Sequence, residues 1–315
     1  MNNLDYHIPV LLTEVLQYID CKDNEIYVDA TFGAGGYSKA LLESSNCRVI
    51  AFDRDSSTKK FANYLKTKFG DRFDYFNNSF SQMIPILKEY GIDGVDGIVY
   101  DLGVSSMQLD DKSRGFSFDS DAKLDMRMDS KISISAFEVV NQFSEDDLCQ
   151  IIKEFGEERK ARLIAKKIIM QREKKEIFSC KELADIVRSF YRGYYKIDPA
   201  TKTFQAIRIF VNDELGEIKA SLANSFDILN KGGRLLVVSF HALEDVIVKK
   251  FFKKEAGLDL SFSRYEPVTQ NEAIKNIQIL TKSAIKPSHK EIINNPRARS
   301  ARLRAALTQI IPIPT

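Results

Sequence analysis

The chain has 315 residues, of which 44% are hydrophobic and 29% are charged, an ordinary composition for a globular protein of one large or two smaller domains. The formal net charge of +2 excludes a polycation, so any surface for nucleic acid must be a local patch. No apolar run approaches the roughly 18 residues of a membrane span, no basic region precedes the apolar stretch near the N-terminus, and the four cysteines form no C-x-x-C pair. We therefore expect a cytoplasmic protein with no membrane segment, signal peptide, metal site or disulfide framework.

After a helix predicted over 13–19, residues 26–38 carry the pattern of a strand, a tight turn and a helix. The apolar run IYV ends in Asp29, and the glycine-rich stretch GAGG follows before the helical pattern. Such a turn lets a ligand approach the bare backbone and the free N–H groups of the helix. A second apolar run ends in Asp53, 20 residues after Gly33, where a nucleotide-binding unit places a ribose-binding acid.

The glycine turn by itself is also compatible with an ordinary strand-to-helix connection. The pairing of Asp29 with Asp53 is what favours a ligand site. Ser38 stands where the dinucleotide fingerprint has its third glycine, which disfavours an NAD-dependent dehydrogenase. Asp29 suits the cationic end of a ligand better than a pyrophosphate.

Two further strand ends follow along the chain. The predicted strand over 73–76 leads to Phe80, which either stacks on a purine at the carboxyl edge of the sheet or joins the core. The predicted strand over 97–101 ends in Asp101. With the two earlier acids, Asp101 makes three carboxylates at one sheet edge, and their mutual repulsion argues against a purely structural role. They predict a polar, partly cationic ligand across the strand ends.

Helical patterns without strand signals fill residues 113–197, which predicts an inserted helical domain. Ser144 is expected to cap one helix, and Ser179 with Glu182 forms a capping box before another. The basic amphipathic pattern over 157–172 indicates either a solvated helix face or a nucleic-acid surface. The charged loop containing RGFSF and LDMRMD is long enough to be either functional or disordered.

The last third of the chain returns to the sheet pattern. A long helix beginning near residue 201 is expected to end at Lys231-Gly232-Gly233, and the apolar run over 234–240 predicts a strand buried on both faces. His241 follows at its end, where a site role competes with a packing role. Two more strands are expected, over 277–280 and 301–307. Four arginines form either a phosphate-binding patch or a salt-bridged surface: Arg297, Arg299, Arg302 and Arg304.

Nine blocks of this sequence together resemble the family of small-subunit ribosomal RNA cytidine methyltransferases called RsmH or MraW. Any one block is a modest signal, but nine in the family's order are specific and cover nearly the whole chain. The blocks are HIPVLLTEVL, VDATFGAGGYS, DRD, DGIVYDLGVSSMQLD, RGFSF with LDMRMD, FGEER, PATKTFQAIRIFVNDEL, GGRLLVVSFHALED and NPRARSARLR.

The resemblance implies an α/β fold in which a Rossmann-like methyltransferase sheet of about seven mostly parallel strands is interrupted by a helical domain. The sheet would occupy 1–112 and 198–315, and the helical domain, 113–197, would recognise the substrate. The implied reaction transfers a methyl group from S-adenosylmethionine to the exocyclic N4 amine of a cytidine in 16S rRNA, near the decoding centre. The implied partner is 16S rRNA or the small ribosomal subunit, with no membrane and no DNA, and a homodimer is left open. The implied cofactor contacts map to Gly35, Gly36, Tyr37, Asp53, Phe80, Asp101 and Gln108.

Three residues are the catalytic candidates: Asp101, Ser105 and His241. We expect the cofactor and a proton acceptor to meet at the turn that begins with Asp101, and His241 is a second candidate acceptor. The sequence departs from the family pattern at Asp198, where a histidine is usual, and at Val246, where an arginine is usual near His241. None of these departures touches the strand-end acids.

Two other classes of function compete with this reading. A DNA amine methyltransferase would carry a D-P-P-Y-like turn, and DLGVSS stands at that position. A non-catalytic ribosome-assembly factor with the same fold would not need the strand-end acids, and all three are present.

Overall fold

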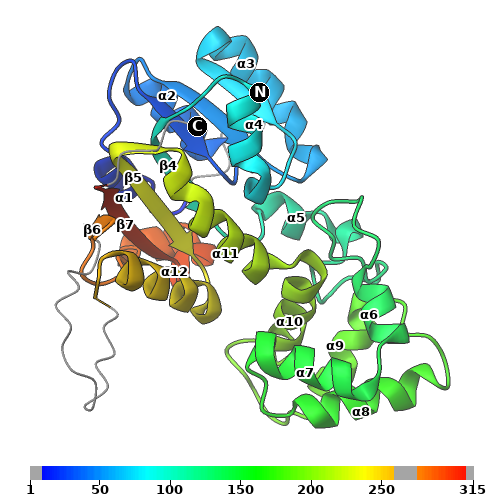
Figure 1. The fold of residues 1–315 in the computed structure, drawn as a ribbon. Coiled ribbons are helices and arrows are strands. Elements are labelled where there is room, and N and C mark those ends of the chain that lie inside the picture. The colour runs from blue at the N-terminus through cyan, green and yellow to red at the C-terminus, as the bar shows by residue number, and fades with distance from the viewer. Residues whose placement is uncertain (1–8, 259–274, 310–315) are drawn as a thin grey trace, which may run out of the picture. The chain divides into compact units, whose positions relative to one another are not determined.

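The computed structural model describes residues 9–258 and 275–309, which form two compact units (Figure 1). Unit 1 comprises Met1–Gly103 and Leu215–Thr315, and unit 2 comprises Val104–Glu214. The helical insertion expected over 113–197 lies inside unit 2. Unit 2 is longer than the expected insertion at both ends, because residues before 113 and after 197 pack into the same hydrophobic core. His7, in the first family block, lies outside the described residues.

Unit 1 is built on a seven-stranded sheet with the strand order β3-β2-β1-β4-β5-β7-β6. The strands β1 to β5 pair in parallel, whereas β7 pairs antiparallel with both β5 and β6. This confirms the expected sheet of about seven mostly parallel strands. The strands are β1 (Ile26–Asp29), β2 (Arg48–Phe52), β3 (Phe73–Phe76), β4 (Val95–Asp101), β5 (Leu229–Ser239), β6 (Ile277–Ile279) and β7 (Arg302–Thr308).

Helices cover both faces of this sheet because its strands are apolar on both sides. In β2, Val49 and Ala51 join one hydrophobic cluster, and Ile50 and Phe52 join the other. The first cluster receives side chains from α1 (Leu12–Ile19), α2 (Gly36–Ser44) and α3 (Lys59–Phe69). The second receives side chains from α4 (Met83–Glu89), α11 (Glu214–Asn224) and α12 (Ala242–Glu255). A short α13 (His289–Asn294) precedes β7.

Unit 2 is helical and has its own hydrophobic core. Ser144 caps α7, and Ser179 with Glu182 forms the expected capping box of α9. The basic helix α8 begins only at Ala161, later than expected, because Glu157 adopts a left-handed conformation after α7. The helices are α5 (Ser106–Asp110), α6 (Ala136–Gln142), α7 (Glu145–Gly156), α8 (Ala161–Arg172), α9 (Cys180–Arg188) and α10 (Thr201–Asn212).

The long helix expected from residue 201 is wrong in two respects. It breaks at Asp213, which has a left-handed φ of +46°, so that α10 and α11 are separate helices. The Lys231-Gly232-Gly233 stretch does not cap a helix but lies within β5. Leu229 pairs with Val95 and Arg234 pairs with Gly97, so the glycines form a bulge in β5. Among the described residues, no helix is long and apolar enough to cross a membrane.

Candidate cofactor site and active site

Asp29, at the end of β1, holds the glycine turn together. Its side chain is fully buried. Its Oδ2 accepts hydrogen bonds from the Ser38 hydroxyl at 2.6 Å and the Ser38 N–H at 3.2 Å, and its Oδ1 accepts from the Thr31 N–H at 3.3 Å. Burial raises the pKa of Asp29 to about 6, even though these hydrogen bonds lower it. Ser38, which replaces the third glycine of the dinucleotide fingerprint, therefore donates two of the three hydrogen bonds to this carboxylate.

The glycines of the turn are required by its backbone and by close packing. Gly33 and Gly35 have φ values of +54° and +79°, which only glycine adopts easily. A Cβ added to Gly36 would lie 2.2 Å from Cγ of Pro9, so this position admits no side chain. The turn thus brings the N-terminus of α2 to the carboxyl edge of the sheet, where the Asp29 carboxylate accepts a hydrogen bond from the Ser38 N–H.

Asp53 follows β2 and is tied to the same turn. Its Oδ2 accepts a hydrogen bond from the Gly33 N–H at 2.7 Å, and its Oδ1 accepts from the Asp55 N–H at 2.8 Å. Burial is the main cause that raises the pKa of Asp53 to about 7. Because a carboxylate oxygen has two lone pairs, both oxygens can also accept a hydrogen bond from a ligand hydroxyl. These two hydrogen bonds thus hold in place the carboxylate that the sequence analysis predicted at the end of this strand.

Asp101 ends β4 beside the same turn, and its N–H donates to Oγ1 of Thr31 at 2.6 Å. Its Oδ1 is buried and has no hydrogen-bond partner among the described residues. Burial raises the pKa of Asp101 well above its usual value, and the nearby charges of Asp29 and Glu244 raise it further. An unsatisfied acceptor in an acidic cluster attracts a cation or a hydrogen-bond donor. The three acids expected to share one edge therefore do so.

His241 follows β5 in unit 1 and is positioned by Glu244, a residue that the sequence analysis missed. The fully buried Glu244 carboxylate accepts hydrogen bonds from the N–H groups of Phe240 at 2.8 Å and His241 at 3.2 Å. Its Oε1 lies 3.0 Å from Nε2 of His241. The H-A-L-E spacing after a predicted strand is a capping-box pattern and could have identified Glu244.

Phe80 and Tyr37 have different environments. Phe80 is partly buried and contacts Tyr100 edge to face, with ring centroids 5.6 Å apart. Tyr37 is buried, and its hydroxyl donates a hydrogen bond to the carbonyl oxygen of Val10. The phenol of Tyr37 therefore belongs to the core, and any ligand contact at this position is made by its backbone.

Ser105 and Gln108 lie in unit 2, where they form the capping box of α5. The Ser105 hydroxyl accepts a hydrogen bond from the Gln108 N–H at 3.3 Å, and Gln108 Oε1 accepts one from the Ser105 N–H at 3.0 Å. Both side chains therefore help to begin the helix. For Ser105, this local role accounts for the residue type without catalysis.

The four arginines near β7 divide into two pairs. Arg297 and Arg299 are exposed in the 3₁₀ turn before the strand. Arg302 and Arg304 lie on β7 and bind the buried Asp245 of α12, with shortest N–O distances of 2.8 and 2.7 Å. Although burial opposes its ionisation, these arginines hold the pKa of Asp245 below its usual value. Arg302 and Arg304 therefore have a structural partner within unit 1.

Replacing Asp245 by Ala should lower the free energy of unfolding by about 3 kcal/mol, because the largely buried Arg304 would lose its partner. Urea unfolding near neutral pH measures this loss. The Glu43→Ala variant is a matched control, since it removes a solvent-exposed ion pair with Lys68 and should cost below about 1 kcal/mol. Equal losses in the two variants would contradict the structural role of Asp245.

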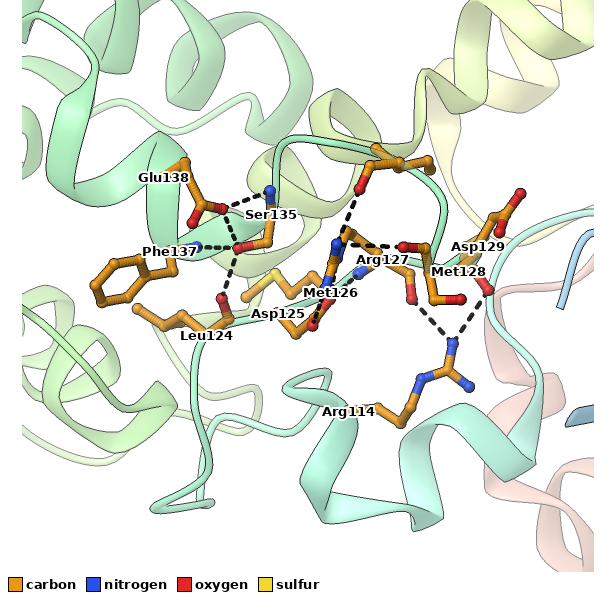
Figure 2. A network of polar contacts seen from close by, with 12 residues as sticks. Arg114, Leu124, Asp125, Met126, Arg127, Met128, Asp129, Ser135, Phe137 and Glu138 are labelled. Carbon is orange, nitrogen blue, oxygen red and sulfur yellow. Dashed lines mark hydrogen bonds and ion pairs between the residues drawn. The ribbon is translucent and has the colours of Figure 1, made fainter. Parts of the chain in front are cut away.

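The RGFSF and LDMRMD loop of unit 2 is ordered by an internal polar network (Figure 2). Arg114 donates hydrogen bonds to the backbone carbonyl oxygens of Arg127 and Met128, and Arg127 binds the Asp125 carboxylate at 2.8 Å. The apolar side chains of the loop are buried in the core of unit 2: Phe116, Leu124, Met126 and Met128. The loop therefore has a structural role that the sequence analysis did not predict.

The sheet order, the glycine turn after β1 and the acids at the strand ends define a Rossmann-like methyltransferase. The family model described as the MraW methylase family matches residues 5–309. The chain belongs to this family.

Individual relatives match over nearly their full length. The ribosomal RNA small subunit methyltransferase H of Orientia tsutsugamushi (strain Ikeda) is 51% identical, covering 98% of this chain and 99% of that one. The protein of the same name from Rickettsia bellii (strain RML369-C) is 52% identical, covering 95% and 98%. Among solved structures, an rRNA methylase from Streptococcus thermophilus covers 96% of this chain and 99% of its own, with a TM-score of 0.43 and 10% identity.

Proposed function

We propose that this chain transfers a methyl group from S-adenosylmethionine to the N4 amine of a cytidine in 16S rRNA of the small ribosomal subunit, near the decoding centre. The observation that carries the proposal is the acidic sheet edge, where the buried Oδ1 of Asp101 lacks a partner among the described residues. Membership of the MraW methylase family supports it. The proposal places the protein in the cytoplasm, with rRNA rather than DNA as its substrate.

The residues at the sheet edge of unit 1 fit S-adenosylmethionine. The free lone pairs of Asp53 can accept hydrogen bonds from ribose hydroxyls. The ring of Phe80 can face the adenine, and the backbone N–H groups at the N-terminus of α2 can donate hydrogen bonds to the ligand. The charge of Asp101 favours the cationic sulfonium or ammonium group. Of the two remaining expected contacts, Tyr37 would act through its backbone, and Gln108 lies in unit 2.

Replacing Asp53 by Asn should weaken binding of S-adenosylhomocysteine about tenfold, because the ribose hydroxyls lose a charged acceptor. Calorimetry with this ligand and with its 2′-deoxyribose analogue isolates the contact. The wild-type protein should bind the deoxy analogue more weakly, and the variant should bind the two ligands alike. Full discrimination by the Asn variant would remove Asp53 from the ribose site.

Methyl transfer requires mainly that the cytosine amine is aligned with the methyl group of the cofactor. When bound, S-adenosylmethionine supplies a methyl group already activated on a sulfonium. The cytosine amine is a poor nucleophile because its lone pair is delocalised into the ring. The protein must therefore hold the amine in line with the methyl carbon, about 3–3.5 Å away, and exclude other orientations. Asp101 ends a strand paired on both sides, so its position at the edge is fixed.

Two groups can accept the proton that the amine loses. Asp101 has a raised pKa, which makes its carboxylate a better base near neutral pH than an ordinary aspartate. His241 is the second acceptor, and the nearby Glu244 carboxylate would stabilise the imidazolium that forms. Ser105 remains a weaker proposal because its hydroxyl caps α5.

The exposed Arg297 and Arg299 would bind phosphates without reading the base sequence, and the paired Arg302 and Arg304 would add charge behind them.

The test offers labelled S-adenosylmethionine to the protein with small subunits lacking the modification, with naked rRNA, or with duplex DNA. Label in N4-methylcytidine from subunits or rRNA is the expected result. Label in DNA would move the protein to the DNA amine methyltransferases. Absence of label, despite tight cofactor binding, would favour an assembly factor.

A further inference from the structure

The loop between α9 and α10 in unit 2 exposes aromatic rings to an unusual degree. Tyr194 is 95% exposed, and Tyr195 is 45% exposed. Large aromatic side chains carry much apolar surface and are mostly buried or half-buried in folded proteins. Two neighbouring exposed tyrosines therefore indicate a surface that contacts something else.

An ion pair at the base of the loop and contacts to Tyr191 hold this loop in place. Arg188 binds Asp198 across the base of the loop, with the closest N–O distance at 2.6 Å. The hydroxyl of Tyr191 donates to the buried Glu158 at 2.6 Å, and Nζ of Lys160 lies 3.9 Å from the centre of the Tyr191 ring. These contacts hold Tyr191 in one orientation.

Tyr195 packs on this anchored ring, while Tyr194 does not join the core. The rings of Tyr195 and Tyr191 meet edge to face, with centroids 5.4 Å apart at 89°. The chain turns at Gly193, whose φ is +91°. Tyr194 thus extends from a supported turn with most of its surface in solvent.

The charged side chains of this loop are all basic. Arg192 and Lys196 flank the exposed tyrosines and are themselves exposed, and residues 189–197 (SFYRGYYKI) contain no acidic residue. The nearest acids in sequence, Asp185 and Asp198, both pair with Arg188, and the anchoring Glu158 accepts the hydrogen bond of the Tyr191 hydroxyl. Cations beside exposed aromatic rings are the combination that binds single-stranded nucleic acid, since bases stack on the rings and phosphates contact the cations.

We propose that this loop is a base-stacking site for a single-stranded segment of RNA, in which Tyr194 stacks on an unpaired base and Arg192 and Lys196 contact the adjoining phosphates. The inference rests on the proposed function, because rRNA is the substrate proposed there. An acidic peptide would satisfy the cations but would give the exposed ring of Tyr194 no planar partner, so RNA is the occupant that uses both features.

The absence of tryptophan from the chain gives a direct test. The Tyr194→Trp variant keeps a stacking ring and introduces the only tryptophan of the chain, whose fluorescence can be excited selectively at wavelengths where tyrosine does not absorb. Adding single-stranded polycytidylate should quench its fluorescence, because a stacked base contacts the indole. The matched control is Tyr90→Trp in unit 1, where the native tyrosine is 60% exposed, and it should not be quenched. Quenching of neither variant or of both, or a response of Tyr194→Trp to polyglutamate in place of RNA, would overturn the proposal.

Affinity measurements separate the stacking contribution from the charge contribution. The Tyr194→Ala variant should bind rRNA about tenfold more weakly with an unchanged salt slope, and Tyr194→Phe should restore the affinity. The double variant Arg192→Ala, Lys196→Ala should reduce the salt slope by up to about two.

The two proposals can fail separately. If the wild-type protein methylates rRNA and Tyr194→Ala binds it with full affinity, the stacking site is wrong and the proposed function stands. If the wild-type protein methylates no RNA while Tyr194→Trp is quenched by polycytidylate, the proposed function is wrong and the stacking site stands.

Discussion

Replacing Asp101 by Asn is expected to weaken S-adenosylmethionine binding by roughly ten- to a hundredfold in calorimetry, the range for losing a charged hydrogen bond. The amide keeps the shape of the carboxylate but removes the negative charge from an acidic edge with an unsatisfied oxygen. Burial raises the pKa of Asp101, and a cationic ligand favours the ionised form of this carboxyl over its neutral form. Wild-type affinity should therefore rise with pH, and Asp101→Asn should show a shallower rise.

The control for Asp101→Asn is Asp96→Asn, which changes a carboxylate near the opposite end of the same strand. Asp96 accepts hydrogen bonds from the Ile26 N–H and the Asn230 side chain, away from the glycine turn. This variant should keep wild-type affinity for S-adenosylmethionine. If Asp101→Asn also keeps its affinity and loses turnover, Asp101 is the proton acceptor instead. If affinity and turnover both survive, Asp101 belongs to neither role.

A second large effect is expected in the pH dependence of stability, through Asp29. Burial raises the pKa of this carboxyl from 3.8 to about 6, so the folded protein binds the proton more tightly than the unfolded chain. The contribution of Asp29 to the free energy of unfolding is therefore greatest at low pH and declines as the pH rises through about 6. Relative to Asp29→Asn, which does not ionise, the wild-type protein should lose about 2 kcal/mol of unfolding free energy between about pH 4.5 and 7.5.

Urea unfolding of the two proteins across this range, without cofactor, measures the difference. Replacement of the exposed Asp93 by Asn serves as the control and should leave the wild-type profile unchanged. A wild-type advantage that grows with pH would mean that the hydrogen bonds from Ser38 and Thr31 outweigh burial, and would reverse the sign assigned to Asp29.

The strand ends were predictable from sequence because short apolar runs bounded by turn residues specify strands locally. Asp29, Asp53 and Asp101 follow directly from that pattern, since parallel strands bring their carboxyl ends to one edge. The helix caps at Ser144 and Ser179 were predictable for the same reason, as each depends on residues within one turn.

Interactions between distant segments were not predictable in this way. The pairing of Asp245 with Arg302 and Arg304 depends on α12 packing beside β7, which no local pattern encodes. The bulge at Gly232 and Gly233 depends on the register between β4 and β5, so the same glycines were interpreted as the end of a helix. Burial of the RGFSF and LDMRMD loop likewise depends on the helices of unit 2.

The position of β5 beside β4 has a consequence for synthesis of the chain. The two strands are neighbours in the sheet, yet the whole of unit 2 is translated between them. At ~5–20 residues per second, the ribosome takes about 6 to 26 s to pass from Asp101 to Leu229. During that interval β4 has an apolar edge without its second neighbour, which exposes the nascent chain to aggregation. Unit 2 can fold during this interval because its core is built from its own residues. We therefore expect chaperones to bind the nascent chain mainly at the incomplete sheet of unit 1.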